Sequence, residues 1–151
     1  MLLLAASDFN WGEIHPMLVH FPIVLFCGVL VCDLLYGIGK KGAFFVGHWM
    51  LFAGALLAIP TVFAGLEAAE QIQASPGLIA EHKFYGLLTA SYAIVYAIFR
   101  AYVYKTNWLI HPIIAVGLSV ILVGLMLKTA EYGGELSHGE ESPPPSGMPS
   151  N

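Results

Sequence analysis

The stretch HPMLVHFPIVLFCGVLVCDLLY, residues 15–36, decides the fold. Among Asp, Glu, Lys and Arg it contains Asp33 alone, and it has the roughly 20 mostly apolar residues that a helix needs to cross a bilayer. Three more long apolar segments follow at residues 44–66, 82–104 and 108–127. The sequence therefore predicts an all-α membrane protein, built as a bundle of four transmembrane helices.

The composition excludes an ordinary soluble domain. Of the 151 residues, 58% are hydrophobic and 11% are charged, whereas soluble domains carry about 25% charged residues. The net charge of -4 argues against a nucleic-acid partner. The chain also lacks the GxSxG and HExxH motifs of hydrolases, so a stand-alone enzyme is disfavoured. The expected surroundings are a lipid bilayer and other membrane subunits.

Polar stretches divide the chain into three parts. Residues 1–14 form an N-terminal extension, residues 15–130 hold the four helices, and residues 131–151 form a polar tail that ends in SPPPSGMPSN. Proline and glycine without apolar side chains cannot offset the entropy lost on ordering. The tail is therefore expected to be largely disordered.

The basic residues predict an orientation in the membrane. Lys40, Lys41, Arg100 and Lys105 lie in or beside the two short connections on one side, whereas acidic residues dominate the other side. Lys and Arg are enriched on the cytoplasmic side of membrane proteins. Both termini are therefore expected on the outer side, with the two short connections inside.

Four histidines near the segment ends are the candidate site residues. His48 and His111 lie at matching depths on the inner side, whereas His20 and His82, on the outer side, differ in depth by roughly 7 Å. Paired imidazoles inside a helix bundle are an established way to hold haem iron, so each pair is a candidate haem b site. Two such sites would carry electrons across the bilayer. The alternative is that these histidines hydrogen-bond to headgroups, water or backbone carbonyls.

Other polar residues keep more than one interpretation. His15 is read as the residue that begins the first helix or as a replacement ligand for His20. Asp33 lies on the same helical face as His15 and could accept a proton, anchor an inner histidine or pair with Lys40 or Lys41. A third hypothesis uses His82, Asp33 and the loop glutamates for metal binding or a proton relay.

Small residues recur at helical spacing in the second and third segments. The second segment has Gly54, Ala58, Thr61 and Gly65, and the third has Gly86, Thr89, Ala93 and Ala97 after His82. Such stripes let two helices approach closely. Small residues beside a histidine would also leave room for a flat macrocycle.

The first segment carries a motif that points to a known family. HPMLVHFPI at residues 15–23 resembles the HPxxVHFPI pattern of a bacterial membrane protein family called domain of unknown function 2231. Further matches are a tryptophan in the second segment, Trp49, and a histidine that opens the third, His82. The family's GGxL element is matched at residues 133–136, and the HG that follows it arrives slightly early, at His138 and Gly139.

The resemblance covers roughly residues 15–139 and implies a redox role. Members of the family are typically four-helix proteins, often encoded with or fused to cytochrome-like modules, and are similar in plan to membrane di-haem cytochromes. The implied function is a b-type cytochrome-like electron-transfer subunit of a larger redox complex in a bacterial inner membrane. His20 and His82 are the ligands that the family pattern favours, haem b is the cofactor, and quinone and a cytochrome c are the expected partners. The alternative is a non-haem structural subunit that packs against a respiratory or photosynthetic complex.

Overall fold

A computed structural model describes residues 10–106 and 110–138 of the chain. The helices in this part are α1 (Trp11–Leu18), α2 (His20–Gly37), α3 (Lys41–Gln71), α4 (Pro76–Lys105) and α5 (Pro112–His138). Helices α1 and α2 follow one another as a single span, so 4 helical spans are long and apolar enough to cross a membrane. The predicted all-α, four-helix transmembrane fold is confirmed.

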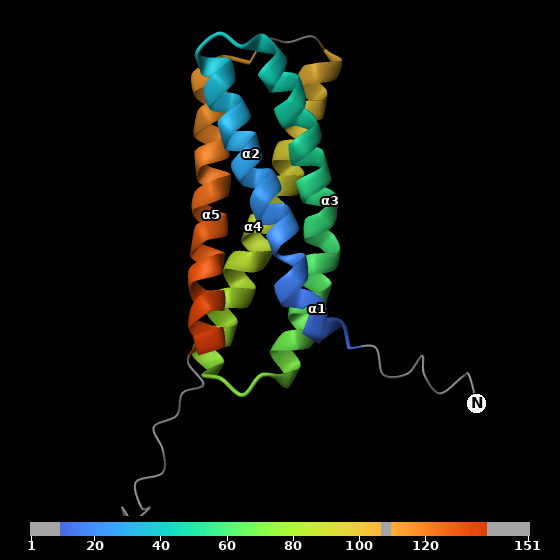
Figure 1. The fold of residues 1–151 in the computed structure, drawn as a ribbon, viewed down its shortest axis with the longest axis vertical. Coiled ribbons are helices and arrows are strands. Elements are labelled where there is room, and N and C mark those ends of the chain that lie inside the picture. The colour runs from blue at the N-terminus through green and yellow to red at the C-terminus, as the bar shows by residue number, and fades with distance from the viewer. Residues whose placement is uncertain (1–9, 107–109, 139–151) are drawn as a thin grey trace, which may run out of the picture.

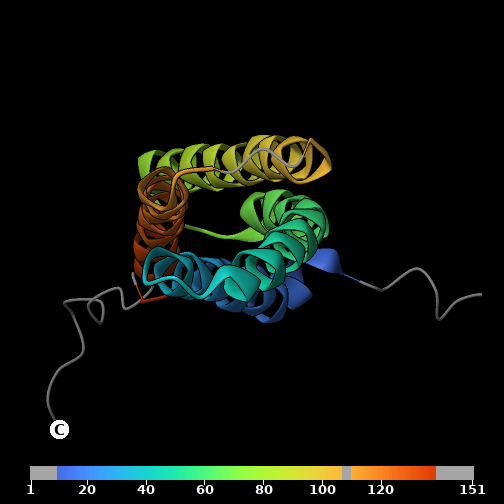
Figure 2. The ribbon, with the colours of Figure 1, turned by 90° about the horizontal axis from the view of Figure 1, so that it is seen from above.

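The four spans lie side by side and run alternately in opposite directions (Figure 1). Seen from above, α2, α3, α4 and α5 occupy the corners of a four-sided bundle (Figure 2). Helix α2 contacts α3 and α5, and α4 contacts the same two neighbours. Helix α1 begins and α5 ends at one end of the bundle, which we call the terminal end (Figure 1). The opposite end, where α2 connects to α3 and α4 to α5, is called the hairpin end.

The first span bends where α1 meets α2. Pro16 and Pro22 flank the junction at Val19, and neither can donate the backbone hydrogen bond that continues a helix. At the hairpin end the chain turns through Gly39, whose φ of 90° lies in the region that glycine adopts without strain. The next helix follows after only a few residues, so α2 and α3 form a tight hairpin.

Helices α3, α4 and α5 are each longer than the apolar segment that predicted them. Helix α4 begins at Pro76, well before His82, and α5 continues to His138, past Glu131, where the tail was expected to start. Proline fits the first turn of a helix, because its missing N–H would have no partner there. A helix also continues past the apolar core, since Lys and Glu side chains are solvated beyond it. Residues 139–151 lie outside the described residues.

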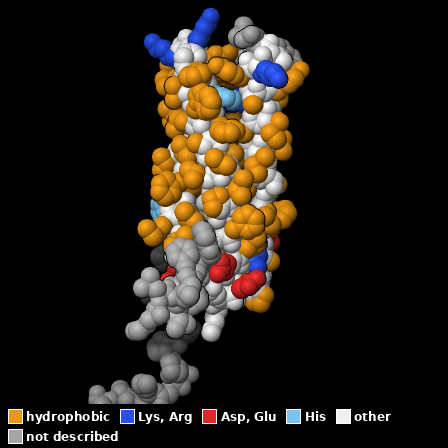
Figure 3. All heavy atoms as spheres, turned by 90° about the vertical axis from the view of Figure 1, so that its right-hand side faces the viewer, with side chains coloured by type: hydrophobic (Ala, Val, Ile, Leu, Met, Phe, Trp, Pro, Cys, Tyr) orange, Lys and Arg blue, Asp and Glu red, His pale blue; other side chains and the backbone are white. Residues whose placement is uncertain are grey.

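The distribution of side chains is that of a membrane protein. Large apolar side chains point outward, such as Phe63, Val95 and Ile113, with exposed fractions of 67%, 65% and 74%. Five of the eleven buried residues in the main core cluster are alanines, and such small side chains let the helices approach closely. Hydrophobic side chains cover the visible face between Lys and Arg at the hairpin end and Asp and Glu at the terminal end (Figure 3).

Candidate functional site

Two histidines from different helices meet near the terminal end of the bundle. Helix α1 supplies His15 and helix α4 supplies His82. The centroids of the two imidazole rings are 6.2 Å apart, and the ring planes are nearly perpendicular, at 85°. Both side chains are half-buried. The bundle thus places two chemically active side chains from separate spans in contact.

Each ring is hydrogen-bonded to a backbone carbonyl of a neighbouring span, α3 for His15 and α5 for His82. Nδ1 of His15 lies 3.0 Å from the carbonyl oxygen of Thr61 in α3, and Nδ1 of His82 lies 3.1 Å from that of Thr129 in α5. A carbonyl oxygen only accepts, so Nδ1 must donate in both rings. In the neutral rings, Nε2 is then unprotonated and free to bind a metal.

Two glycines make room for the rings. A Cβ atom on Gly65 would lie 2.7 Å from Cε1 of His15, and one on Gly133 would lie 3.1 Å from Cε1 of His82. Each glycine follows the carbonyl-bearing threonine by one helical turn. Any larger residue at either position would therefore push its imidazole away.

The structure does not bring His20 and His82 together. His20 is exposed, because five residues after His15 correspond to about 140° of rotation on an α-helix and direct the side chain outward. The sequence predicts a difference in depth between His20 and His82. His15 and His82 instead lie at the same depth, and His82 lies within α4, which begins at Pro76. The partner of His82 is therefore His15, for which the sequence predicts either the start of the first helix or a replacement ligand.

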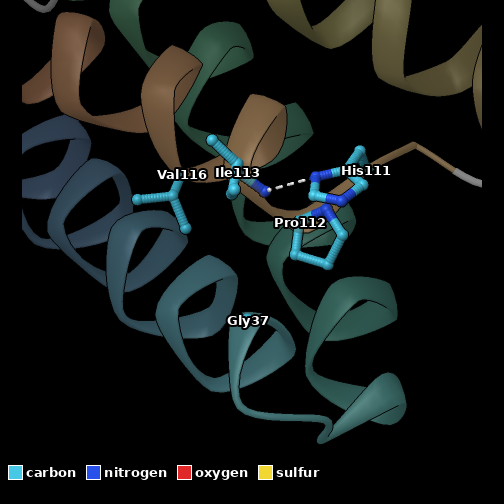
Figure 4. A pocket seen from close by; sticks show the side chains of 5 residues that line it. All are labelled: Gly37, His111, Pro112, Ile113 and Val116. Carbon is cyan, nitrogen blue, oxygen red and sulfur yellow. Dashed lines mark hydrogen bonds between the residues drawn. The ribbon is translucent and has the colours of Figure 1, made fainter.

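His48 and His111 are also kept apart. His48 is buried in α3, where its ring stacks on Tyr104 of α4 at 5.1 Å and 12°. His111 is exposed just before α5, and its Nδ1 accepts a hydrogen bond from the Ile113 N–H at 3.4 Å (Figure 4). With Gly37 it lines a shallow groove between α2 and α5. Helices α3 and α5 occupy opposite corners of the bundle, so the two residues face different neighbours.

Sequence reasoning missed a buried ion pair toward the hairpin end. Arg100 of α4 donates to both carboxylate oxygens of Asp33 in α2, at 2.7 and 2.9 Å. The hydroxyls of Tyr96 and Ser119 also donate to this carboxylate. Arg100 further donates to the carbonyl of Phe44 at 3.0 Å. The partner of Asp33 is thus Arg100, and the predicted pairing with Lys40 or Lys41 is wrong.

The ion pair between Asp33 and Arg100 is fully buried in the bundle. Asp33 is 0% exposed and Arg100 1%, so both charges lie inside a lipid-surrounded bundle. An unpaired charge at this depth is strongly unfavourable, and paired charges there are typically structural or functional elements. The ion pair links α2 to α4 across the diagonal of the bundle, and no backbone contact between these two helices occurs among the described residues.

The site offers two protein ligands to a metal. Within residues 10–106 and 110–138, no group of three or more His, Cys, Asp or Glu side chains could hold a metal ion. The predicted cluster of His82 with the loop glutamates therefore does not form in this part of the chain. His138 lies at the end of α5, and its side chain is outside the described residues.

These features define a multi-pass α-helical membrane protein with a two-histidine site near one end and a buried ion pair toward the other. Residues 12–141 match the family described as predicted membrane protein (DUF2231), and the chain belongs to this family. The resemblance seen in the motifs is thereby confirmed. No curated protein and no solved structure matches the chain. The likeness in plan to di-haem cytochromes stays a prediction.

Proposed function

We propose that the protein is an electron-transfer subunit of a larger redox complex in a bacterial inner membrane, and that His15 and His82 hold the iron of one haem b. The observation that carries the proposal is the meeting of these two imidazoles from separate spans. It keeps the cytochrome-like function predicted from the sequence and replaces His20 by His15 as a ligand. The inner pair is not part of the proposal, because His48 and His111 face different neighbours.

The residues present fit the iron of a haem, because histidine imidazole is a common haem ligand and the two rings come from separate spans. Their centroids are 6.2 Å apart, a separation that would suit two imidazoles sharing one metal ion, because each metal–nitrogen bond is about 2 Å long. Both Nδ1 atoms donate to carbonyls, which leaves Nε2 as the ligand atom and raises its basicity.

When bound, the haem would accept and release one electron. The chain's own residues would hold and orient the ligands: Thr61 and Thr129 fix the tautomer, and Gly65 and Gly133 set the ring positions. The site lies near one end of the bundle, so electrons would be exchanged close to one membrane surface. A quinol as donor and a cytochrome c as acceptor are the partners proposed.

Haem content of purified variants tests the proposal. Wild-type protein is expected to show a Soret band and a pyridine haemochrome signal that His15→Ala and His82→Ala abolish. His20→Ala and His111→Ala are the matched controls, since both residues are exposed, and they should keep wild-type haem content. Equal haem content in all five proteins would contradict the proposal.

One observation favours the non-haem structural subunit as a second candidate. The two rings lie edge to face, an arrangement that aromatic rings also adopt when they only pack against each other. A structural subunit would show no Soret band after purification or after haem addition. It would also copurify with its redox complex in the His15→Ala and His82→Ala variants.

A further inference from the structure

The two halves of the bundle repeat the same polar positions. Arg100 follows Asp33 by 67 residues, and His82 follows His15 by the same interval. The threonine whose carbonyl receives the imidazole lies 46 residues after His15 in the first half and 47 residues after His82 in the second. Each half therefore supplies one imidazole, one threonine carbonyl that receives it and one buried charged side chain. The two sequences differ at most other positions.

The packing of the halves repeats as well. Thr61 and Thr129 each turn their hydroxyl back to the carbonyl one turn earlier, at 2.8 and 3.0 Å. Core positions also correspond at nearly the same interval: Val29 and Tyr96 are 0% and 3% exposed. Leu51 and Ser119 are both 0% exposed. Two segments with little identity thus bury corresponding positions.

The contacts between helices have the symmetry that such a repeat requires. Helices α2 and α3 form one hairpin and α4 and α5 the other, and the hairpins touch through α3 with α4 and through α2 with α5. A half-turn about the long axis of the bundle exchanges α2 with α4 and α3 with α5, as the view along that axis shows (Figure 2). His15 with His82, and Asp33 with Arg100, would meet on this axis.

We propose that the chain is two equivalent helical hairpins related by an approximate two-fold axis, and that Asp33 and Arg100 are positioning residues that set the register in which His15 meets His82. Helices transmit a shift along their length, and a slip by one turn would move one imidazole past the other by about 5.4 Å. The ion pair prevents such a slip because its bidentate geometry tolerates one register only. Like charges at these equivalent positions would repel on the axis, and the chain carries opposite charges instead.

The inference deepens the proposed function, on which it rests for the role of the histidine pair. Its test measures a distance between the hairpins and not haem. Spin labels are attached to the full-length protein in lipid nanodiscs at Glu13→Cys and Ala80→Cys. Both positions are exposed and are related by the 67-residue interval that separates Asp33 from Arg100. The native Cys27 and Cys32 are replaced by alanine, so pulsed electron paramagnetic resonance reports the distance between the two labels alone.

Single charge changes and the double exchange are expected to affect the distance between the labels in opposite ways. The parent protein should show one narrow distance, and Asp33→Arg or Arg100→Asp alone should broaden or shift it. The exchange, Asp33→Arg with Arg100→Asp, should return most of the molecules to the narrow distance. The control is the exposed pair Lys128 and Glu131, 2.9 Å apart, whose charge reversal should leave the distance unchanged.

Two outcomes would overturn the inference. One is an unchanged narrow distance in the single variants, which would show that the pair does not set the register. The other is an exchange variant that behaves like the single variants. Where the single variants fail to fold, the folded yield takes the place of the distance: the exchange should exceed both singles at least tenfold, and a yield no higher than theirs contradicts the inference. An absence of haem would reject the proposed function and leave these results unaffected.

Discussion

At the scale of single residues, Gly65 and Gly133 control how closely α3 and α5 approach the two imidazoles. We expect Gly65→Ala and Gly133→Ala to displace a ring and to destabilise the protein by about 1–3 kcal/mol, the usual cost of overpacking a filled interior. Gly65→Ala should have the larger effect, because its Cβ would lie 2.7 Å from the imidazole, against 3.1 Å at Gly133. Thermal unfolding in detergent measures the loss, and haem content measures the effect on the site.

Gly124→Ala is the matched control for this pair. It also lies in α5, but an added Cβ would have no neighbour within 4 Å. The change should leave stability unaltered or raise it slightly, because alanine favours the helix. If the control loses as much stability as Gly65→Ala, the close contact is not the cause.

The buried ion pair gives a second prediction at this scale. Arg100→Met should destabilise the protein by about 3–5 kcal/mol, since it leaves the Asp33 carboxylate buried without its counter-ion. The double change Asp33→Leu with Arg100→Met should cost less than Arg100→Met alone, because no charge is then left unpaired. Equilibrium unfolding of the wild type, Asp33→Leu, Arg100→Met and the double variant forms a double-mutant cycle. Additive losses would contradict a direct coupling of the two side chains.

Some residue roles could not be read from the sequence. The motif HPMLVH contains two histidines, and the choice between His15 and His20 depends on the rotation of α1 and its bend at Val19, which no periodicity reveals. For Asp33 the sequence leaves a proton acceptor, an anchor for an inner histidine and a partner of Lys40 or Lys41 as alternatives. Its true partner, Arg100, comes from a helix on the far side of the bundle. The equal spacing of Asp33 from His15 and of Arg100 from His82 was the signal that could have identified it.

At the scale of elements, α1 is held in place by its first residues. The side chain of Asn10 accepts a hydrogen bond from the Gly12 N–H at 2.9 Å and pairs with the Gln71 amide at the end of α3. Asn10→Ala should cost about 1 kcal/mol through loss of the helix cap, and should raise hydrogen exchange in residues 11–18. Asn10→Ser keeps a capping oxygen and should retain most of the protection. Unchanged exchange in Asn10→Ala would mean that packing alone holds α1.

The four spans could be predicted well, whereas their ends could not. Apolar runs longer than a bilayer is thick leave few alternatives to a transmembrane helix. The apolar pattern, however, ends at the membrane surface, whereas the helices continue beyond it. Helix α4 therefore starts earlier than the hydrophobicity indicates, and α5 ends later. This extension also brought His82 to the depth of His15, which the pattern alone could not show.

At the scale of the whole molecule, the charges at the two ends predict a fixed orientation. Lys40 and Lys41 lie at the hairpin end, and Glu13, Glu70 and Glu131 are exposed near the terminal end. A fusion of alkaline phosphatase to the C-terminus should therefore be active, because that enzyme matures only outside the cytoplasm. A fluorescent protein inserted between Lys40 and Lys41 should also be bright. The reverse pattern would invert the orientation predicted from the basic residues.

The diagonal position of the Asp33 and Arg100 pair has a consequence for biogenesis. The first hairpin leaves the ribosome with its carboxylate in place, while the guanidinium that neutralises it is still to be synthesised in α4. A lone carboxylate is costly in lipid, so the insertion machinery has a physical reason to retain α2 until the third span arrives. The nascent chain would then be released into the bilayer as one assembled unit, and not one helix at a time.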